Sequence, residues 1–203
     1  IIMSIKLGVA PIAWSNDDMP ELGAETTLEQ CLSEASLAGF TGIESGGKFP
    51  KKSEELLPKL EKEKLELCSG WYGAQLLNNN AKKEFSLMKN QLQLFKDCKS
   101  PCMVFAEVTN SIQGDPNTPL SKKPKLSKDD WNKLISRINE ISKMMADEGM
   151  PLAYHHHMGT VIETEDETKR LMESTIDTVK LLIDTGHMLF AGGNAINLVK
   201  NFS

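Results

Sequence analysis

Short apolar runs alternate with amphipathic segments along the whole chain. Each apolar run is five to seven residues long, a length typical of buried strands. The runs lie at residues 5–10, 40–44, 65–70, 102–108, 151–157 and 179–184. Between these runs, apolar residues recur at the spacing of one helix face. This second pattern predicts helices at residues 27–38, 53–63, 81–98, 128–148, 165–172 and 195–201.

Several residue types mark where the helices begin and end. Thr26 is expected to cap the first helix, with Glu29 completing a capping box, and Gly39 suits the position just past its end. Ser127 is the expected N-cap of the long fourth helix, which Gly149 ends.

Regular alternation of strands and helices implies parallel strands joined by crossover helices. No glycine-rich phosphate loop follows the first strand, so the pattern lacks the fingerprint of nucleotide-binding folds. Polar or aromatic residues instead follow nearly every strand, as at the C-terminal face of a (β/α)8 barrel: Trp14, Glu44, Trp71, Glu107, His155–His157 and Asp184. We therefore predict an α/β fold, a (β/α)8 TIM barrel. A complete barrel has eight units and roughly 250 residues, so residues 1–203 are expected to form one incomplete barrel domain with about six units.

Composition narrows the class of protein. A net charge of −5 argues against a nucleic-acid partner, because the single lysine-rich stretch, residues 122–128, is short and typical of a solvated loop. The four cysteines match neither a zinc ribbon nor a redox pair, which favours reduced core thiols. No apolar run is as long as a membrane span, and no signal peptide is recognisable. We expect a cytoplasmic protein without a membrane partner.

Three of the four histidines are consecutive and end the fifth strand. Because side chains alternate along a strand, His155 and His157 are expected on one side and His156 on the other. The odd-numbered pair then reaches one metal or one substrate at the mouth of the barrel. Alternatively, the three histidines form a surface tract, or they lie in the core with their rings bonded to the backbone.

The sixth strand ends in Asp184, and a buried carboxylate at that place must be paired, hydrogen-bonded or metal-bound. After Gly186 turns the backbone, His187 returns towards the same place. Asp184 is interpreted as a metal ligand, and His187 as either a ligand or an orienting group. The alternative is that Asp184 only caps the next helix.

The remaining candidates are less specific. Glu107 is a reserve acid or base, unless it forms an ion pair with a lysine of a neighbouring strand. Trp14 and Trp71 suit the wall of a sugar-like pocket, although aromatic residues at strand ends often only pack. Asn16 has loop chemistry suited to substrate hydroxyls, and Lys48 is a cation for an enolate or, alternatively, a solvated lysine.

The chain resembles the xylose-isomerase-like barrel superfamily of sugar isomerases, epimerases and apurinic endonucleases. The element Asp184-Thr-Gly-His187 looks like its metal-ligand motif on strand six. Within that superfamily, long stretches are similar to the inosose dehydratases of inositol catabolism: residues 8–22, 42–50, 106–114, 154–160 and 184–193.

Two differences from the superfamily pattern affect the expected site. Where members commonly present a glutamate on strand five, the register set by Gly159 places His155. The histidine and glutamate that members supply from strands seven and eight have no counterpart, so the chain is expected to be truncated at its C-terminal side.

The resemblance implies dehydration of 2-keto-myo-inositol, a polyol ketone, with Co²⁺ or Mn²⁺ and glutathione. The metal would be held by Asp184 and His155. His157 and His187 would orient substrate or carry protons, and Glu107 would be a further candidate acid or base. A ketose epimerase or isomerase, or an inactive fragment that binds metal or polyol without turnover, are the alternatives. The oligomeric state stays open, a homo-oligomer included.

Overall fold

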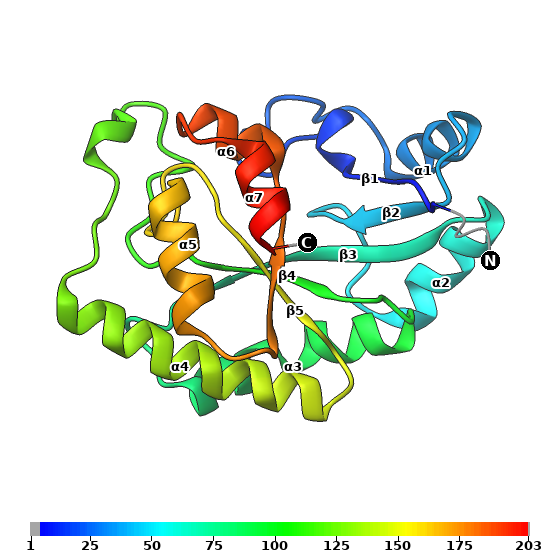
Figure 1. The fold of residues 1–203 in the computed structure, drawn as a ribbon. Helices are drawn as coiled ribbons and strands as arrows, with labels where there is room; N and C mark the ends of the chain where they lie inside the picture. The colour runs from blue at the N-terminus through cyan, green and yellow to red at the C-terminus, as the bar shows by residue number, and fades with distance from the viewer. Residues whose placement is uncertain (1–4, 203) are drawn as a thin grey trace. The chain divides into compact units, whose positions relative to one another are not determined.

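The structure, a computed structural model, describes residues 5–202, and Figure 1 shows strands and helices alternating along the chain. The strands follow one another in a six-stranded sheet in the order β1-β2-β3-β4-β5-β6. The strands are β1 (Gly8–Val9), β2 (Gly42–Ser45), β3 (Glu66–Ala74), β4 (Met103–Glu107), β5 (Leu152–His155) and β6 (Val179–Leu182). The helices are α1 (Leu28–Leu37), α2 (Ser53–Lys62), α3 (Ala81–Asp97), α4 (Lys128–Asp147), α5 (Glu165–Ser174), α6 (Thr185–Phe190) and α7 (Ala195–Phe202), with short 3-10 turns at Pro11–Ala13 and Leu120–Lys122.

The chain divides into two compact units, and β3 begins in the first and ends in the second. Residues 5–71 and 89–103 make up the first unit, and residues 72–88 and 104–202 make up the second. Each unit is described by itself below. The expectation of one domain over residues 1–203 stays a prediction.

In the first unit, β1, β2 and β3 pair in parallel, with Gly8 opposite Gly42 and Ile43 opposite Leu67. Both glycines lie close to Cys68 on β3: a Cβ on Gly8 would lie 3.0 Å from its sulfur, and one on Gly42 would lie 3.2 Å from its Cβ. In the same unit, α1 and α2 contribute buried side chains at helical spacing: Leu28, Cys31, Leu32, Ala35, Leu56 and Leu60.

In the second unit, β5 and β6 pair in parallel, with Leu152 opposite Val179 and His155 opposite Leu182. The long helix α4 buries one apolar stripe: Trp131, Leu134, Ile138, Ile141 and Met145. Ser127 caps α4 by accepting from the backbone N–H of Asp130, as predicted.

Most predicted helix and strand positions are confirmed, with shifts at their ends. Thr27, not Thr26, caps α1, because its hydroxyl accepts from the N–H of Gln30, three residues on. β3 continues to Ala74, so Trp71 lies within the strand instead of in a turn after it. Helix α6 was missed altogether, because its six residues carry no helical repeat of apolar positions.

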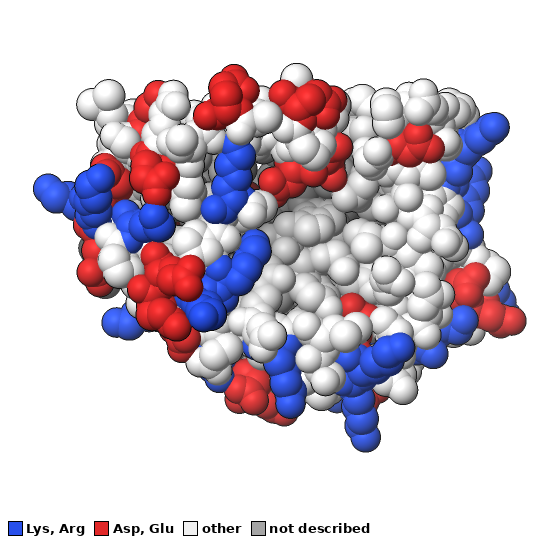
Figure 2. All heavy atoms as spheres, turned by 180° about the vertical axis from the view of Figure 1, so that it is seen from behind, with Lys and Arg blue, Asp and Glu red and all other residues white. Residues whose placement is uncertain are grey.

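Within residues 5–202, no helix is long and apolar enough to cross a membrane. Acidic and basic side chains are interspersed on the face drawn in Figure 2.

The long segment 109–126 is fastened to the start of α5 through Lys123. The Lys123 ammonium donates to both carboxylate oxygens of Glu167, at 2.8 and 3.0 Å, and also to the carbonyl of Thr160. Glu167 further accepts from the backbone N–H groups of Glu163 and Thr164. Although burial opposes it, bonding with Lys123 and these two N–H groups lowers the pKa of Glu167.

Replacing Lys123 by Met should lower the free energy of unfolding at neutral pH by about 2 kcal/mol, because a half-buried carboxylate loses its cation. A folded-state pKa below the unfolded value adds stability above the unfolded pKa, and that stability disappears as the pH falls through the folded pKa. The difference between K123M and the wild-type chain should therefore shrink below about pH 4. Urea unfolding at pH 7 and at pH 3.5 measures it.

The matched control is Lys169→Met, which breaks the exposed i,i+4 pair with Glu173 and should change stability little. Equal effects of K123M and K169M at pH 7 would contradict this role for Lys123.

Candidate metal centre

The three consecutive histidines divide between two faces, as the strand alternation predicts. From Leu152 to His157 the even-numbered side chains are buried and the odd-numbered ones are partly exposed. His155 and His157 therefore share one face, with ring centroids 5.3 Å apart, while His156 is fully buried on the other.

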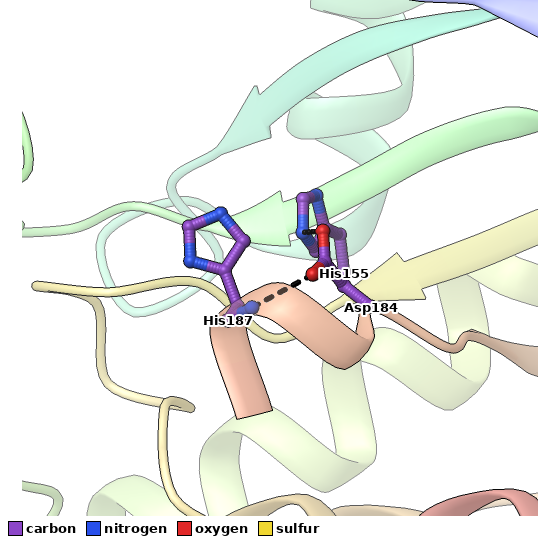
Figure 3. A group of neighbouring side chains, drawn as sticks. All are labelled: His155, Asp184 and His187. Carbon is purple, nitrogen blue, oxygen red and sulfur yellow. Dashed lines mark hydrogen bonds and ion pairs between the residues drawn. The ribbon is translucent and has the colours of Figure 1, made fainter. Parts of the chain in front are cut away.

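Asp184 lies just beyond β6, and its two carboxylate oxygens have different partners (Figure 3). One oxygen, Oδ1, accepts from the backbone N–H of His187 at 2.8 Å and so caps α6. The other, Oδ2, lies 3.3 Å from Nε2 of His155. The Asp184 carboxylate can therefore cap α6 with one oxygen and contact His155 with the other.

His187 is carried back to this place by the first turn of α6. Its ring centroid lies 5.1 Å from that of His155 and 4.1 Å from that of His157. The backbone N–H of Met158 donates a long bond of 3.5 Å to its Nδ1. His155 and His187 therefore both lie beside the Asp184 carboxylate, and the His157 ring packs against the His187 ring.

The electrostatics of the cluster favour a charged Asp184 and a neutral His187 near neutral pH. The bond with His155, together with the N–H of His187, holds the pKa of Asp184 well below its usual range. Burial, aided by the neighbouring His157, lowers the pKa of His187 to about 4. Burial likewise lowers the pKa of His156 to about 4. Near neutral pH, Asp184 is thus an anion, and His156 and His187 are neutral.

One donor atom from each of His155, Asp184 and His187 lies within 4.8 Å of the other two. Ligand atoms around one ion are typically bound at about 2.0–2.2 Å, which places them roughly 3–4 Å from each other. The three donors are therefore close to the spacing that an ion requires, and two imidazoles with one carboxylate suit several divalent metals. The donor set fits a divalent ion, and the geometry adds His187 to the two ligands predicted from sequence.

His157 has a different set of contacts. Its Nδ1 lies 2.9 Å from the carbonyl of Met158. If Nδ1 carries the ring proton and donates to this carbonyl, then Nε2 is the basic nitrogen.

The turn after His157 is held by contacts that the sequence analysis did not predict. Gly159 has φ +74° and donates its N–H to Glu163 at 2.6 Å, while its carbonyl accepts from Ile112 of the long segment. A Cβ on Gly159 would lie 2.9 Å from the backbone nitrogen of Gln113. A glycine followed by glutamate four residues later was the available signal, but the partner segment is distant in sequence.

Glu107 is fully buried at the end of β4 and accepts two backbone N–H groups, from Leu76 at 2.5 Å and from Thr109 at 2.8 Å. Burial raises its pKa, and the bonds to Thr109 and Leu76 oppose that rise. No lysine partner is recorded for this carboxylate among residues 5–202. Glu107 therefore joins the ends of β3 and β4, and its role as an acid or base stays a prediction.

The four predicted substrate-binding residues lie in the first unit, where each has local partners. Trp14 donates from Nε1 to Glu34 at 2.6 Å. Asn16 accepts from the N–H groups of Asp18 and Met19 through its side-chain oxygen. The carbonyl of Trp71 accepts from the side-chain amide of Gln91.

Lys48 was expected to be a cation for substrate or a solvated lysine, and its contacts fit neither description well. Its ammonium donates to three backbone carbonyls, those of Gly23, Ala24 and Thr26, at 2.5–3.1 Å. These bonds use all three donors of an ammonium group. Lys48 therefore holds the loop before α1, and a contact with substrate would have to replace these bonds.

Residues 32–202 match the family model described as the xylose isomerase-like TIM barrel. The chain therefore belongs to this family, which confirms the predicted fold class. Among curated relatives, the rhizopine catabolism protein MocC of Rhizobium meliloti is 41% identical over 197 residues, covering 97% of this chain and 61% of that protein. Inosose dehydratase 2 of Bacillus cereus is 41% identical over 201 residues, covering 98% of this chain and 67% of that protein.

Solved structures show the same fold at low sequence identity. The probable 3-DHS dehydratase AsbF of Bacillus anthracis has a TM-score of 0.71 at 15% identity, covering 98% of this chain and 69% of that chain. The IolI protein with a bound zinc atom has a TM-score of 0.66 at 13% identity, covering 94% of this chain and 66% of that chain.

Replacing Glu107 by Ala should lower the free energy of unfolding by about 2–4 kcal/mol, because two buried backbone N–H groups lose their acceptor. Chemical denaturation at pH 7 measures the change. Glu173→Ala, at an exposed helix position, serves as the control. An E107A chain as stable as E173A would contradict the joining role.

Proposed function

We propose that the protein is a hydro-lyase that removes water from 2-keto-myo-inositol (scyllo-inosose) and yields 3D-trihydroxycyclohexane-1,2-dione, a step of inositol catabolism. The observation that carries the proposal is the cluster of His155, Asp184 and His187 beside His157. Support also comes from 41% identity, over nearly the whole chain, to a protein named inosose dehydratase.

In this proposal His155, Asp184 and His187 hold a divalent ion. Such an ion is a Lewis acid that polarises the ketone and stabilises the negative charge that develops when the adjacent carbon loses its proton. Asp184 supplies the anionic donor, and its bond to the N–H of His187 fixes the direction of its second oxygen. Nδ1 of His187 accepts a long bond from the N–H of Met158, and whichever ring nitrogen holds the ion would have to be unprotonated.

His157 is assigned the proton transfer. Its Nδ1 faces the carbonyl of Met158, so Nε2 is the nitrogen that takes the proton from the carbon beside the ketone. The imidazolium formed in that step can return the proton to the departing hydroxyl, which leaves as water. The elimination leaves an enol, which becomes the dione when its hydroxyl proton moves to carbon, so the net change is the loss of one water.

Other parts of the proposal rest on the family resemblance. Co²⁺ or Mn²⁺ is the expected ion, although two histidines and one carboxylate also suit iron and zinc. Glutathione is proposed as a further cofactor without an assigned binding residue. Trp14, Asn16, Lys48 and Trp71 stay proposed substrate contacts. We place the protein in the cytoplasm.

Replacing Asp184 by Asn should weaken binding of Mn²⁺ or Co²⁺ by more than about 100-fold, because the site loses its anionic donor. Asn remains a good N-cap, so α6 should persist in the variant. Isothermal titration calorimetry on the chain, with Zn²⁺ and Fe²⁺ in parallel, measures the affinity. Asp177→Asn, at an exposed position, is the matched control. Unchanged affinity in D184N would refute this ligand assignment.

Replacing His157 by Gln should lower kcat by about 10²–10⁴-fold and leave metal affinity unchanged, because the residue moves a proton and binds no metal. The assay uses the protein with scyllo-inosose as substrate. Loss of water with a new diketone absorbance supports the dehydratase. Isomer formation without loss of water would identify an epimerase or isomerase, and metal binding without turnover would identify a binding protein.

A further inference from the structure

His156 is the one histidine of the four that turns away from the candidate metal centre. Its side chain is fully buried, on the face of the β5 segment that also buries Leu152 and Tyr154. It nevertheless reaches Asp184, because the backbone N–H of Asp184 donates to its Nε2 at 3.4 Å. A residue on the core side thus contacts the backbone of the carboxylate that faces the site.

The bond fixes the form of the His156 ring. A ring nitrogen that accepts a hydrogen bond carries a lone pair, so the proton of the neutral ring belongs on Nδ1. Within residues 5–202, Nδ1 of His156 is buried and has no hydrogen-bond partner. An apolar residue would avoid this unsatisfied donor, so histidine at this position costs stability.

The backbone of Asp184 needs such an acceptor. β6 ends at Leu182, and Asp184 has extended dihedral angles, φ −103° and ψ 104°, as the N-cap of α6. Its N–H therefore falls between the sheet and the helix, where neither supplies an acceptor. The position of this peptide sets where both carboxylate oxygens point, towards the N–H of His187 and towards Nε2 of His155.

We propose that His156 is a positioning residue for the metal centre, which holds the Asp184 backbone through its Nε2 so that the carboxylate faces His155 and His187. This inference rests on the proposed function, because it concerns a site that binds a divalent ion.

The test compares His156→Leu with His156→Gln by titration calorimetry with Mn²⁺. Leu keeps the volume apolar and removes the acceptor, so affinity should fall about 10- to 100-fold, the effect typical of residues that orient a metal ligand. Gln offers an amide oxygen to the Asp184 N–H and should recover most of the affinity. Melting temperatures of the metal-free variants are measured in parallel.

Thr168→Val is the control for general loosening of the second unit. Thr168 is also fully buried, and its hydroxyl donates to the carbonyl of Thr164 within α5, away from the metal-binding side chains. T168V should bind Mn²⁺ like the wild-type chain even if its melting temperature falls. H156L with wild-type affinity, or T168V with an equal loss, would overturn the proposal. A wild-type chain that binds no divalent ion would instead refute the proposed function.

A second measurement needs no metal. Long-range ¹H–¹⁵N correlation spectra of the metal-free chain should show His156 with its proton on Nδ1, identified by loss of the signal in H156Q. A proton on Nε2 would rule out the bond from Asp184 and with it the proposed role.

Discussion

The carboxylate of Asp184 is the group on which the geometry of the candidate metal centre depends. One oxygen caps α6 through the N–H of His187, and the other faces His155. The cap determines where α6 starts, and the start of α6 determines where the His187 ring stands. If the carboxylate rotated towards one task alone, either the helix start or the contact with His155 would be lost. Asp184 thus joins local helix formation to the assembly of the site.

The alternation of side-chain directions along β5 is a second constraint on the site, because it determines which histidines face Asp184. His155 and His157 face the site because they are two residues apart, and His156 faces the core for the same reason. A shift of one residue in the pairing of β5 with β6 would exchange these faces. The register is maintained by Leu152 and Tyr154, which are fully buried on the core side. Packing on the core face therefore decides which imidazoles reach the carboxylate.

The sequence was sufficient to predict contacts that depend on periodicity. The order of strands and helices, the Ser127 cap and the opposite orientations of His155 and His156 all follow from local spacing, and the fold class follows from the repeated strand–helix pattern. Helix α6 could not be predicted, since its N-cap, Asp184, also reads as the end of a strand and Gly186 disfavours a helix. The bonds of Lys48 and Glu107 were equally inaccessible. The carbonyl partners of Lys48 are 22–25 residues away, and the Leu76 N–H that binds Glu107 is 31 residues away. Because every residue has these backbone groups, the sequence does not show which of them a side chain will bind.

In the proposed metal site, His155 stands where the family resemblance implies a glutamate, and this difference would change the charge of the donor set. Two neutral imidazoles and one carboxylate leave one positive charge with a divalent ion, whereas a second carboxylate would leave none. A more positive centre attracts the developing charge of a ketone oxygen more strongly, because electrostatic stabilisation grows with the charge that faces it. Both dehydration and epimerisation begin with removal of the proton beside the ketone, so both pass through this developing charge. In the proposed site, His155 therefore favours chemistry at a ketone without distinguishing between the two reactions.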